Sequence, residues 1–385
     1  MLVKAITGSK KYWAWLIFLL LIIGSGFSCY LWQLNKGLTI TGLSRDVSWG
    51  LYISQFTFLV GVAASAVMVV LPYYLHNVKD FGRITVLGEF LAVAALIMCL
   101  LFVIVDVGKP MRILNMIFYP TPRSMFFWDM IALNGYLLLN IIAGWHALEA
   151  EYKDVPPPAW TKILVYISIP WAVSIHTVTA FLYAGLPGRH YWLTAIMAAR
   201  FLASAFASGP ALLILLCYII RRFSRFDPGR EAIQKLAAIV TYATIVSAFF
   251  IGLEFFTAFY SQVPAHGIYT LKYLFVGLEG HGRLVPFMWT FVLLIIAALV
   301  ILLNSSTRRK DGLLQLACAA VFIAMWIEKG IGLVIGGFIP NPFERVVEYV
   351  PTLPEIMIAL GVWAVGLLVL TLLYKIAVSV KEKAA

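Results

Sequence analysis

The chain has 385 residues, of which 62% are hydrophobic and only 12% are charged, and its mean hydropathy is +0.92. Soluble domains carry roughly a quarter charged residues, so this composition excludes a soluble globular protein. A net charge of +11 would indicate a nucleic-acid partner in a soluble protein, but in membrane proteins the loop lysines and arginines chiefly set topology.

Apolar runs of about 20 residues recur along the chain and predict about ten membrane-spanning helices, because a helix satisfies its own backbone polar groups in lipid. We expect these helices near residues 13–34, 49–75, 84–106, 125–148, 162–184, 195–221, 233–260, 286–304, 312–337 and 355–378. The predicted fold class is all-α, a polytopic membrane protein with a single integral membrane domain over 1–385. Helices 2–5 and 6–9 are expected to form two four-helix bundles, flanked by the first and last helices.

The predicted connections differ in charge between the two membrane faces. Most of the 29 lysines and arginines fall on the side of the N-terminus, with the clearest clusters at 221–225 and 308–310. Because cytoplasmic loops carry an excess of Lys and Arg, we expect both termini on the cytoplasmic side of a prokaryotic cell (inner) membrane.

The connections on the opposite, outer face are rich in glycine, proline and aromatic residues. They comprise residues 48–52, 106–129, 185–192, 260–286 and 338–351. Gly and Pro fix tight turns, and Trp and Tyr prefer the membrane interface, which explains part of this composition. The 106–129 stretch also carries three cations between Asp106 and Asp129, which indicates a site at this face.

Ionisable residues also lie within the predicted spans, where a charge is costly and usually marks a function or an internal pair. Those towards the outer face or the middle of the membrane are Asp106, Asp129, His176, Arg200, Glu254, Glu328 and Lys329. Those towards the inner face are Glu89, His146 and Glu149. For Arg200, Glu328 and Lys329, a purely structural pairing between helices is an equally good interpretation.

The cysteine and histidine positions do not predict a metal or haem site. The four cysteines each lie alone in an apolar run, without CxxC or ferredoxin-type spacing. A membrane haem needs paired axial ligands at matching depth, but only His176 lies near mid-membrane, whereas His190, His266 and His281 fall in outer loops. We therefore expect no haem, no iron–sulfur cluster and no metal ligands in this chain.

Five short segments carry a family resemblance. They are 48–52 (SWGLY), 106–112 (DVGKPMR), 124–129 (SMFFWD), 174–177 (SIHT) and 200–202 (RFL). In this order and on this face they resemble the NrfD/PsrC family of integral membrane, quinone-interacting subunits. Segments 328–340 and 348–352 are most similar to its DsrP (HmeB) subgroup, the membrane subunits of DsrMKJOP (Hme) complexes. The resemblance covers nearly the whole chain.

The resemblance implies a subunit without redox cofactors of its own that binds menaquinone or menaquinol as a substrate near the outer face. It implies electron exchange with a ferredoxin-like, four-cluster iron–sulfur subunit docked on that face. Cytochrome c, membrane cytochrome b and heterodisulfide-reductase-like subunits are the further partners implied, with a role in sulfite or sulfate metabolism. The direction of electron flow and proton translocation stay open, and so does the question whether the chain is itself an enzyme.

Within this resemblance we expect Asp129, Asp106 and His176 to be the catalytic residues. The aspartates would exchange protons with the quinone oxygens, and His176 would bind the far carbonyl or begin a proton relay. The residues expected to bind the quinone, tune the carboxylates or support the site are Tyr52, Trp49, Lys109, Arg112, Ser124, Trp128, Ser174, Arg200 and Glu254. Lys109 and Arg112 have docking of the partner as their alternative role.

Two other classes of function fit the same pattern. About ten helices, ionisable residues in the spans and Gly/Pro-rich loops are also typical of a secondary transporter. A passive membrane anchor for an outer redox protein would use the polar cluster only for assembly. The one-sided position of the charges, together with the resemblance, favours the quinone-binding subunit.

Overall fold

The computed structural model describes residues 2–261 and 268–384, and within them it contains no β-strand. In that part of the chain, ten helical spans are long and apolar enough to cross a membrane. These findings confirm the predicted all-α, polytopic fold, and the spans lie within a few residues of the expected ranges. His266, which the sequence assigns to an outer connection, lies outside the described residues.

The ten spans are built from twelve main helical segments. These are α1 (Lys10–Lys36), α2 (Leu51–Val62), α3 (Ser65–Leu75), α4 (Thr85–Asp106), α6 (Met125–Lys153), α7 (Ala159–Ala184), α8 (Met197–Phe223), α9 (Arg230–Ser261), α11 (Val285–Leu303), α13 (Asp311–Met325), the π-helical η7 (Trp326–Ile335) and α14 (Leu353–Ala384). The shorter elements are η1 (Leu2–Ile6), η2 (Gly37–Ile40), η3 (Lys79–Arg83), η4 (Pro110–Leu114), α5 (Asn115–Phe118), η5 (His190–Trp192), α10 (Tyr269–Phe275), α12 (Ser305–Arg308) and η8 (Gly336–Phe338).

Local sequence signals set several helix ends. Ser9 caps α1, because its hydroxyl oxygen accepts the backbone N–H of Tyr12 at 3.3 Å. Gly37 ends α1 with a φ of 74°, a conformation that glycine adopts without strain. The long helix α6 ends at Asp154, also in the left-handed region, and the prolines at 156–158 follow it. Proline cannot continue a helix, so the chain turns back here.

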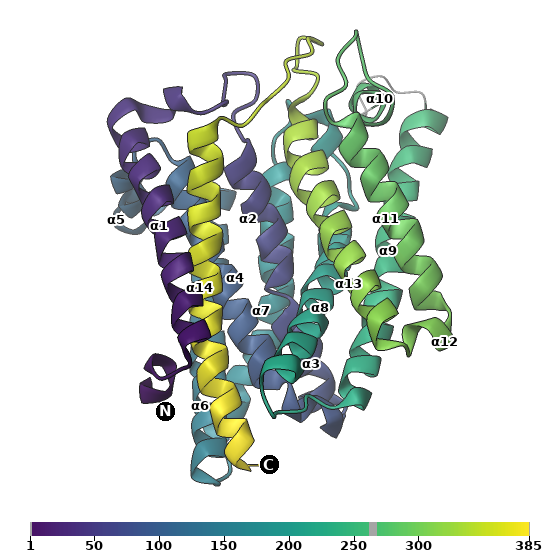
Figure 1. The fold of residues 1–385 in the computed structure, drawn as a ribbon. Helices are drawn as coiled ribbons and strands as arrows, with labels where there is room; N and C mark the ends of the chain where they lie inside the picture. Colours follow the sequence, from purple (N-terminus) through teal and green to yellow (C-terminus); the bar gives the residue numbers. More distant parts are fainter. Residues whose placement is uncertain (1, 262–267, 385) are drawn as a thin grey trace.

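The molecule has two different ends (Figure 1). Both termini lie at the lower end in that view, which we call the terminal end, whereas α5 and α10 lie at the upper end, which we call the loop end. The loop end carries the connections 37–50, 107–124, 185–196, 268–284 and 339–352, and the terminal end carries 76–84, 154–158, 224–229 and 304–310. The two ends are the two faces that the charge pattern distinguishes.

The helices pack as two groups and a flanking pair. The first group contains α2, α3, α4, α6 and α7, and the second contains α8, α9, α11 and α13. Helices α1 and α14 pack along each other and α14 packs against α4 (Figure 1). Gly26 and Gly361 lie at their crossing, where a Cβ on Gly26 would meet the Gly361 Cα at 2.8 Å. Small residues allow such close approach of membrane helices.

The sequence predicted the second span as one continuous helix, but the structure divides it into two. Helix α2 ends at Val62 and α3 begins at Ser65, with a turn at the two alanines between them. Gly209 of α8 packs against this turn, since a Cβ there would meet the Ser65 backbone nitrogen at 2.8 Å. Gly88 of α4 approaches the same turn, and its carbonyl accepts the Ser65 hydroxyl at 3.2 Å. The turn between α2 and α3 therefore contacts both α4 and α8.

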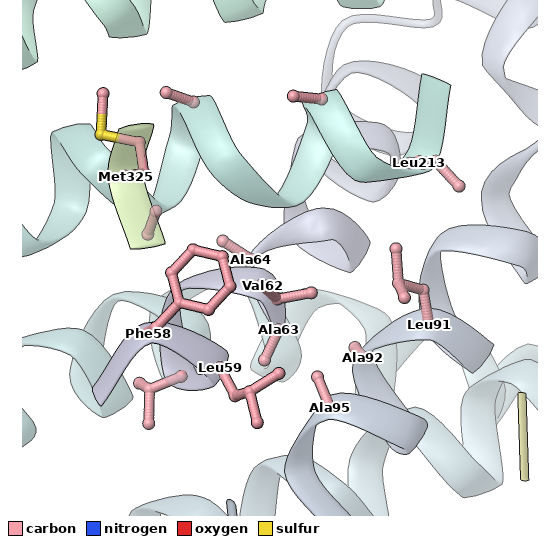
Figure 2. Packing of buried hydrophobic residues seen from close by; sticks show 14 of the residues in the cluster. Phe58, Leu59, Val62, Ala63, Ala64, Leu91, Ala92, Ala95, Leu213 and Met325 are labelled. Atoms are coloured by element: carbon pink, nitrogen blue, oxygen red, sulfur yellow. The ribbon is translucent and has the colours of Figure 1, made fainter. Parts of the chain in front are cut away.

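The apolar core around this turn combines small and large side chains (Figure 2). Ala63, Ala64, Ala92 and Ala95 let α2, α3 and α4 approach closely, and Phe58 fills the space beside them. Close packing of this kind holds membrane helices together, because lipid supplies no hydrophobic driving force between them. The core thereby fixes the positions of the polar residues nearer the loop end.

Candidate functional site

Asp129 lies in α6 close to the loop end, about 6 Å along the helix from its first residue, and only 1% of it is exposed. The Thr179 hydroxyl of α7 donates a hydrogen bond to Asp129 Oδ1 at 2.6 Å. The same hydroxyl lies 2.8 Å from the carbonyl oxygen of Ile175, one turn earlier, which fixes its position. A buried carboxylate with a positioned hydroxyl partner is suited to hold and exchange a proton.

An aromatic cluster lies one turn further towards the loop end. It consists of Trp49, Tyr183, Trp192 and Phe338. The Trp49 ring stacks on Trp192 at a centroid distance of 5.8 Å, and Tyr183 packs edge-on against Trp192 at 5.1 Å. Phe338 packs edge-on against Trp192 at 5.0 Å, and the Tyr183 hydroxyl hydrogen-bonds with Thr57 of α2. The cluster thus connects α7 and three loop-end segments. Of its four members, the sequence predicted only Trp49 as a quinone-binding residue.

Asp106, at the end of α4, belongs to a second polar group. The Tyr52 hydroxyl donates to Gln33 Oε1 at 2.8 Å, and Gln33 Nε2 donates to the carbonyl of Val105 at 2.6 Å. Asp106 Oδ1 is buried without a hydrogen-bond partner among the described residues. A buried polar atom without a partner is costly, so this oxygen is available to a ligand or water.

Glu355, in the first turn of α14, ties two loop-end connections together and is fully buried. Its Oε2 accepts the backbone N–H groups of Gly42 at 3.0 Å and Thr352 at 3.3 Å. The Tyr349 hydroxyl donates to Glu355 and accepts the backbone N–H of Leu51 at 2.9 Å. Burial raises the pKa of Tyr349, and the nearby charge of Glu355 raises it further, by a smaller amount. The phenol therefore stays protonated.

Arg200 forms the centre of a buried ionic group between three helices. Its guanidinium lies 2.6 Å from Glu328 Oε1 of η7 and 3.7 Å from Glu254 Oε1 of α9. The side chains of all three are at most 11% exposed. Such a group holds α8, α9 and η7 in register, as the structural interpretation of Arg200 and Glu328 predicts.

Lys329 and His176 lie deeper, towards the middle of the bundle. The Lys329 ammonium donates to the carbonyl of Phe201 at 3.3 Å and lies 4.3 Å from the centre of that ring. His176 is fully buried beside Phe206, and neither of its ring nitrogens has a hydrogen-bond partner among the described residues. His176 therefore has free polar atoms, whereas the ammonium of Lys329 has local partners.

Other predicted site residues lie on the surface or bind the local backbone. Lys109 and Arg112 are exposed, and no ion pair joins them to Asp106 or Asp129 in the described structure, so the idea that they tune these carboxylates by direct pairing is not supported. The Trp128 indole is 45% exposed and donates to the Pro122 carbonyl at 2.8 Å, which removes it from the expected ring slot with Trp49. The remaining two, Ser124 and Ser174, are partly buried, and Ser174 donates to the Trp171 carbonyl at 2.7 Å.

Glu348 joins the connection 339–352 to the segment before α11. It accepts the backbone N–H of Arg283 at 2.9 Å and the Tyr273 hydroxyl at 3.1 Å, and His281 lies at 3.4 Å. Burial acts against ionisation, but these donors hold the pKa of Glu348 below its usual value. Because the pKa of Glu348 is lowered, its contacts stabilise the loop end at pH values above the usual glutamate pKa. This stabilisation is lost as the pH falls through the folded-state pKa of Glu348.

Within the described residues, no group of three or more His, Cys, Asp or Glu side chains could hold a metal ion. The four cysteines are free thiols, and three of them are buried. The expectation that the chain carries no haem or cluster stays a prediction.

These features together define a polytopic, all-helical membrane protein with several buried ionisable residues towards its loop end. Residues 39–340 match the family model described as "Polysulphide reductase, NrfD". Because this match covers well over half of the 385 residues, the chain belongs to the NrfD family, which confirms the resemblance seen in the short segments.

Curated relatives come from several prokaryotes. The chain is 25% identical to a selenate reductase subunit of Mesobacillus selenatarsenatis, covering 94% of this chain and 92% of that protein. It is 25% identical to the "Hdr-like menaquinol oxidoreductase integral membrane subunit" of Archaeoglobus fulgidus, covering 65% and 62%. It is 21% identical to the "Menaquinone reductase, integral membrane subunit" of Nitratidesulfovibrio vulgaris, covering 95% and 91%. The match to the Archaeoglobus protein spans less than two thirds of that protein's length. A further match, to a Halobacterium salinarum protein, covers 56% of that protein's length.

Proposed function

We propose that this chain is the membrane subunit of a multi-subunit oxidoreductase and binds menaquinone or menaquinol near its loop end. The observation that carries this proposal is the buried carboxylate of Asp129, held by Thr179 one turn from the aromatic cluster. The names of the Archaeoglobus and Nitratidesulfovibrio relatives supply the ligand class. NrfD membership favours this function over that of a secondary transporter.

The proposed chemistry assigns proton handling to this chain. Reduction of a quinone to a quinol consumes two electrons and two protons, and oxidation releases them. Asp129 and Asp106 exchange these protons at their carboxylate oxygens, and the free nitrogens of His176 accept or relay a proton from deeper in the bundle. The hydroxyl oxygens of Tyr52 and Ser174, whose own protons are donated within the protein, accept a hydrogen bond from a quinol hydroxyl. Trp49 supplies a flat apolar wall.

We propose that Arg200 and Glu254 act behind this site. Their ion pair fixes the α8–α9 side of the bundle and so supports the shape of the slot. Ser124 and Trp128, at the start of α6, contribute at its rim. The quinone ring enters from the lipid, where its apolar tail remains.

In this proposal the loop end faces outwards and both termini face the cytoplasm of a cell (inner) membrane. The basic connections at the terminal end support this orientation. A ferredoxin-like, four-cluster iron–sulfur subunit docks on the loop end and exchanges electrons with the quinone. The exposed cations Lys109 and Arg112 and the connections 185–192 and 338–351 contact this partner.

The finer proposal is that the complex is of the DsrMKJOP (Hme) type. It rests on the likeness of segments 328–340 and 348–352 to the DsrP (HmeB) subgroup. The further partners are then cytochrome c, membrane cytochrome b and heterodisulfide-reductase-like subunits, and the electrons serve sulfite or sulfate metabolism. Proton translocation would use the inner-side residues Glu89, His146 and Glu149 as relay groups.

The variant Asp129→Asn tests the proposed function in the assembled complex. The amide oxygen still accepts the Thr179 hydroxyl, but the side chain no longer exchanges a proton. We expect menaquinol-linked electron transfer to fall by about 100-fold, while the purified complex retains all of its subunits. Steady-state turnover with a soluble menaquinol analogue measures the effect.

Glu279→Gln is the matched control, because Glu279 is an exposed carboxylate at the same end of the molecule. It should retain the turnover of the unmodified complex. Full turnover in an assembled Asp129→Asn complex would overturn the assignment of Asp129 and would support the passive-anchor alternative.

A further inference from the structure

A polar cavity lies at the terminal end, opposite the proposed quinone site. Its volume is about 570 Å³, and its polar and charged lining includes Lys4, Thr7, Arg225, Lys375, Glu382 and Lys383. These residues come from the segment before α1, the α8–α9 connection and the last turns of α14. Neither the NrfD family match nor the proposed redox function assigns a role to this cavity.

The cations of this cavity are not neutralised by the protein. Lys4, Arg225, Lys375 and Lys383 line it, and in the described structure none of them forms an ion pair with a carboxylate. The one carboxylate in the lining, Glu382, accepts the backbone N–H of Arg225 at 2.8 Å. The cavity therefore carries a net positive charge that favours an anion.

A neighbouring lysine, Lys381, differs from the four cavity cations because it has an ion-pair partner. Lys381 is only 4% exposed, and its ammonium forms an ion pair with Glu151 of α6 at 2.8 Å. The fold thus satisfies the buried lysine and leaves the four cavity cations open to solvent or to a ligand. Unpaired cations facing one space repel one another, so a bound anion would stabilise this arrangement.

Ordered contacts build the walls of the cavity. The Tyr12 hydroxyl donates to the carbonyl of Ala5 at 2.6 Å and holds η1 against α1, while the Lys375 ammonium lies 5.6 Å from the centre of the Tyr12 ring. Phe226, which is 7% exposed, also lines the cavity. The Lys383 ammonium lies 5.5 Å from the Tyr152 ring of α6. Two of the four cations, Lys375 and Lys383, therefore lie against aromatic rings at the edge of this space.

The cavity lies where the spanning helices leave the apolar layer. Helix α8 ends just before Arg225, and the apolar sequence of α14 gives way to lysines and Glu382. Exposed aromatics flank this level, since Trp13 is 43% exposed and Phe223 is 83% exposed. Trp is enriched at membrane interfaces, and exposed aromatic surface there can contact acyl chains.

We propose that this cavity binds the phosphate-bearing headgroup of an anionic phospholipid at the terminal face of the membrane. The four cations contact the phosphate oxygens, and the acyl chains lie against the exposed side chains of α1 and α8. Basic pockets between membrane helices bind anionic headgroups in this way. The volume lies within the usual range for small-molecule sites, and the position at the membrane level favours a lipid over a free phosphate ion.

Native mass spectrometry of the full chain in a neutral detergent tests this proposal. The probes are phosphatidylglycerol, phosphatidylcholine and inorganic phosphate. The triple variant Lys4→Gln, Arg225→Gln, Lys375→Gln should bind phosphatidylglycerol about tenfold more weakly than the unmodified chain, because each basic residue near the surface contributes to anionic lipid binding. Glu382→Gln should bind it more tightly, since it removes the one negative charge.

The control variant Lys79→Gln, Arg309→Gln, Lys310→Gln removes the same charge from exposed positions at the same end of the molecule. It should retain phosphatidylglycerol. If both triple variants lost phosphatidylglycerol equally, the attraction would be one of diffuse charge and the proposed site would be overturned. Equal retention of phosphatidylcholine and phosphatidylglycerol would overturn it as well. Displacement of the lipid by inorganic phosphate at millimolar concentration would identify a free anion as the ligand and overturn the lipid assignment.

Discussion

Asp129 and Arg200 are both buried ionisable residues, but their surroundings differ. Arg200 has two carboxylates within ion-pair distance, so its charge is balanced by the fold. Asp129 has a neutral hydroxyl as its hydrogen-bond partner, and its charge depends on the proton that it holds. We therefore interpret the Arg200 group as a structural support and Asp129 as the chemical residue.

The Arg200 interpretation predicts a large loss of stability when its charge is removed. Arg200→Gln leaves Glu328 and Glu254 buried without a cation, and we expect a loss of about 3–5 kcal/mol in the free energy of unfolding. The double variant Arg200→Gln, Glu328→Gln should recover part of this loss. Unfolding in mixed detergent micelles measures both values.

Lys153→Gln supplies the comparison, because Lys153 pairs with Glu149 at the surface and its side chain is 60% exposed. Its cost should stay below about 1 kcal/mol. If Arg200→Gln cost no more than this exposed pair, the Arg200 group would not be the support that we describe.

At the residue scale the charged members of the candidate site are conspicuous in the sequence, but their partners are not. Asp129, Arg200 and Glu254 are conspicuous because charges are rare in membrane helices. Thr179 and Tyr183 are ordinary residues in such helices, and only the folded structure shows that they face Asp129 and Thr57. The pairing of Arg200 with Glu328 likewise depends on tertiary packing, because these residues are 128 positions apart.

At the scale of the element, two interruptions of regular helix lie beside the polar groups. The turn between α2 and α3 contacts Gly209 of α8, and the π-helical η7 carries both Glu328 and Lys329. A π-helical segment changes the direction in which successive side chains point and is frequent at functional sites. Gly330 lets η7 approach α2, since a Cβ there would meet the Ser54 carbonyl oxygen at 3.0 Å.

Because Gly209 packs against the turn between α2 and α3, we expect the stability of the fold to be unusually sensitive to substitution of Gly209. Gly209→Ala would bring a methyl group within 3.0 Å of backbone atoms of Ser65 and Val62, and backbone cannot move aside as a flexible side chain can. We expect a loss of about 1–3 kcal/mol in the free energy of unfolding, measured by thermal or detergent denaturation.

Gly252→Ala in α9 is the control, because no atom lies within 4 Å of a Cβ at that position. There alanine should be neutral or stabilise the helix by up to about 1 kcal/mol. Equal behaviour of the two variants would contradict the close backbone contact at the α2–α3 turn.

Hydropathy predicted the spans well because their length follows from the thickness of the bilayer. It did not predict the α2–α3 turn or η7, since neither contains a proline and the local sequence is as apolar as that of a regular helix. Their shape follows from backbone contacts with other helices. The short helix α10 within 260–286 was also missed, because its seven residues are fewer than a spanning pattern requires.

On the scale of the whole molecule, the two ends have different chemistry. The loop end combines buried carboxylates, aromatic rings and connections tied together by Glu355 and Glu348. The terminal end carries basic connections and the cavity of unpaired cations. In our account the first end handles the quinone and its redox partner, and the second anchors the molecule to anionic lipid.

Photoaffinity labelling of the assembled complex with a light-activated menaquinone analogue tests the central claim most directly. The label should attach to the first turns of α6 around Asp129 and the last turns of α7 around Thr179 and Tyr183, and excess unlabelled menaquinone should suppress it. Saturable labelling confined to the terminal end or to the lipid-facing side of α11, with none on α6 or α7, would contradict a quinone site at the loop end.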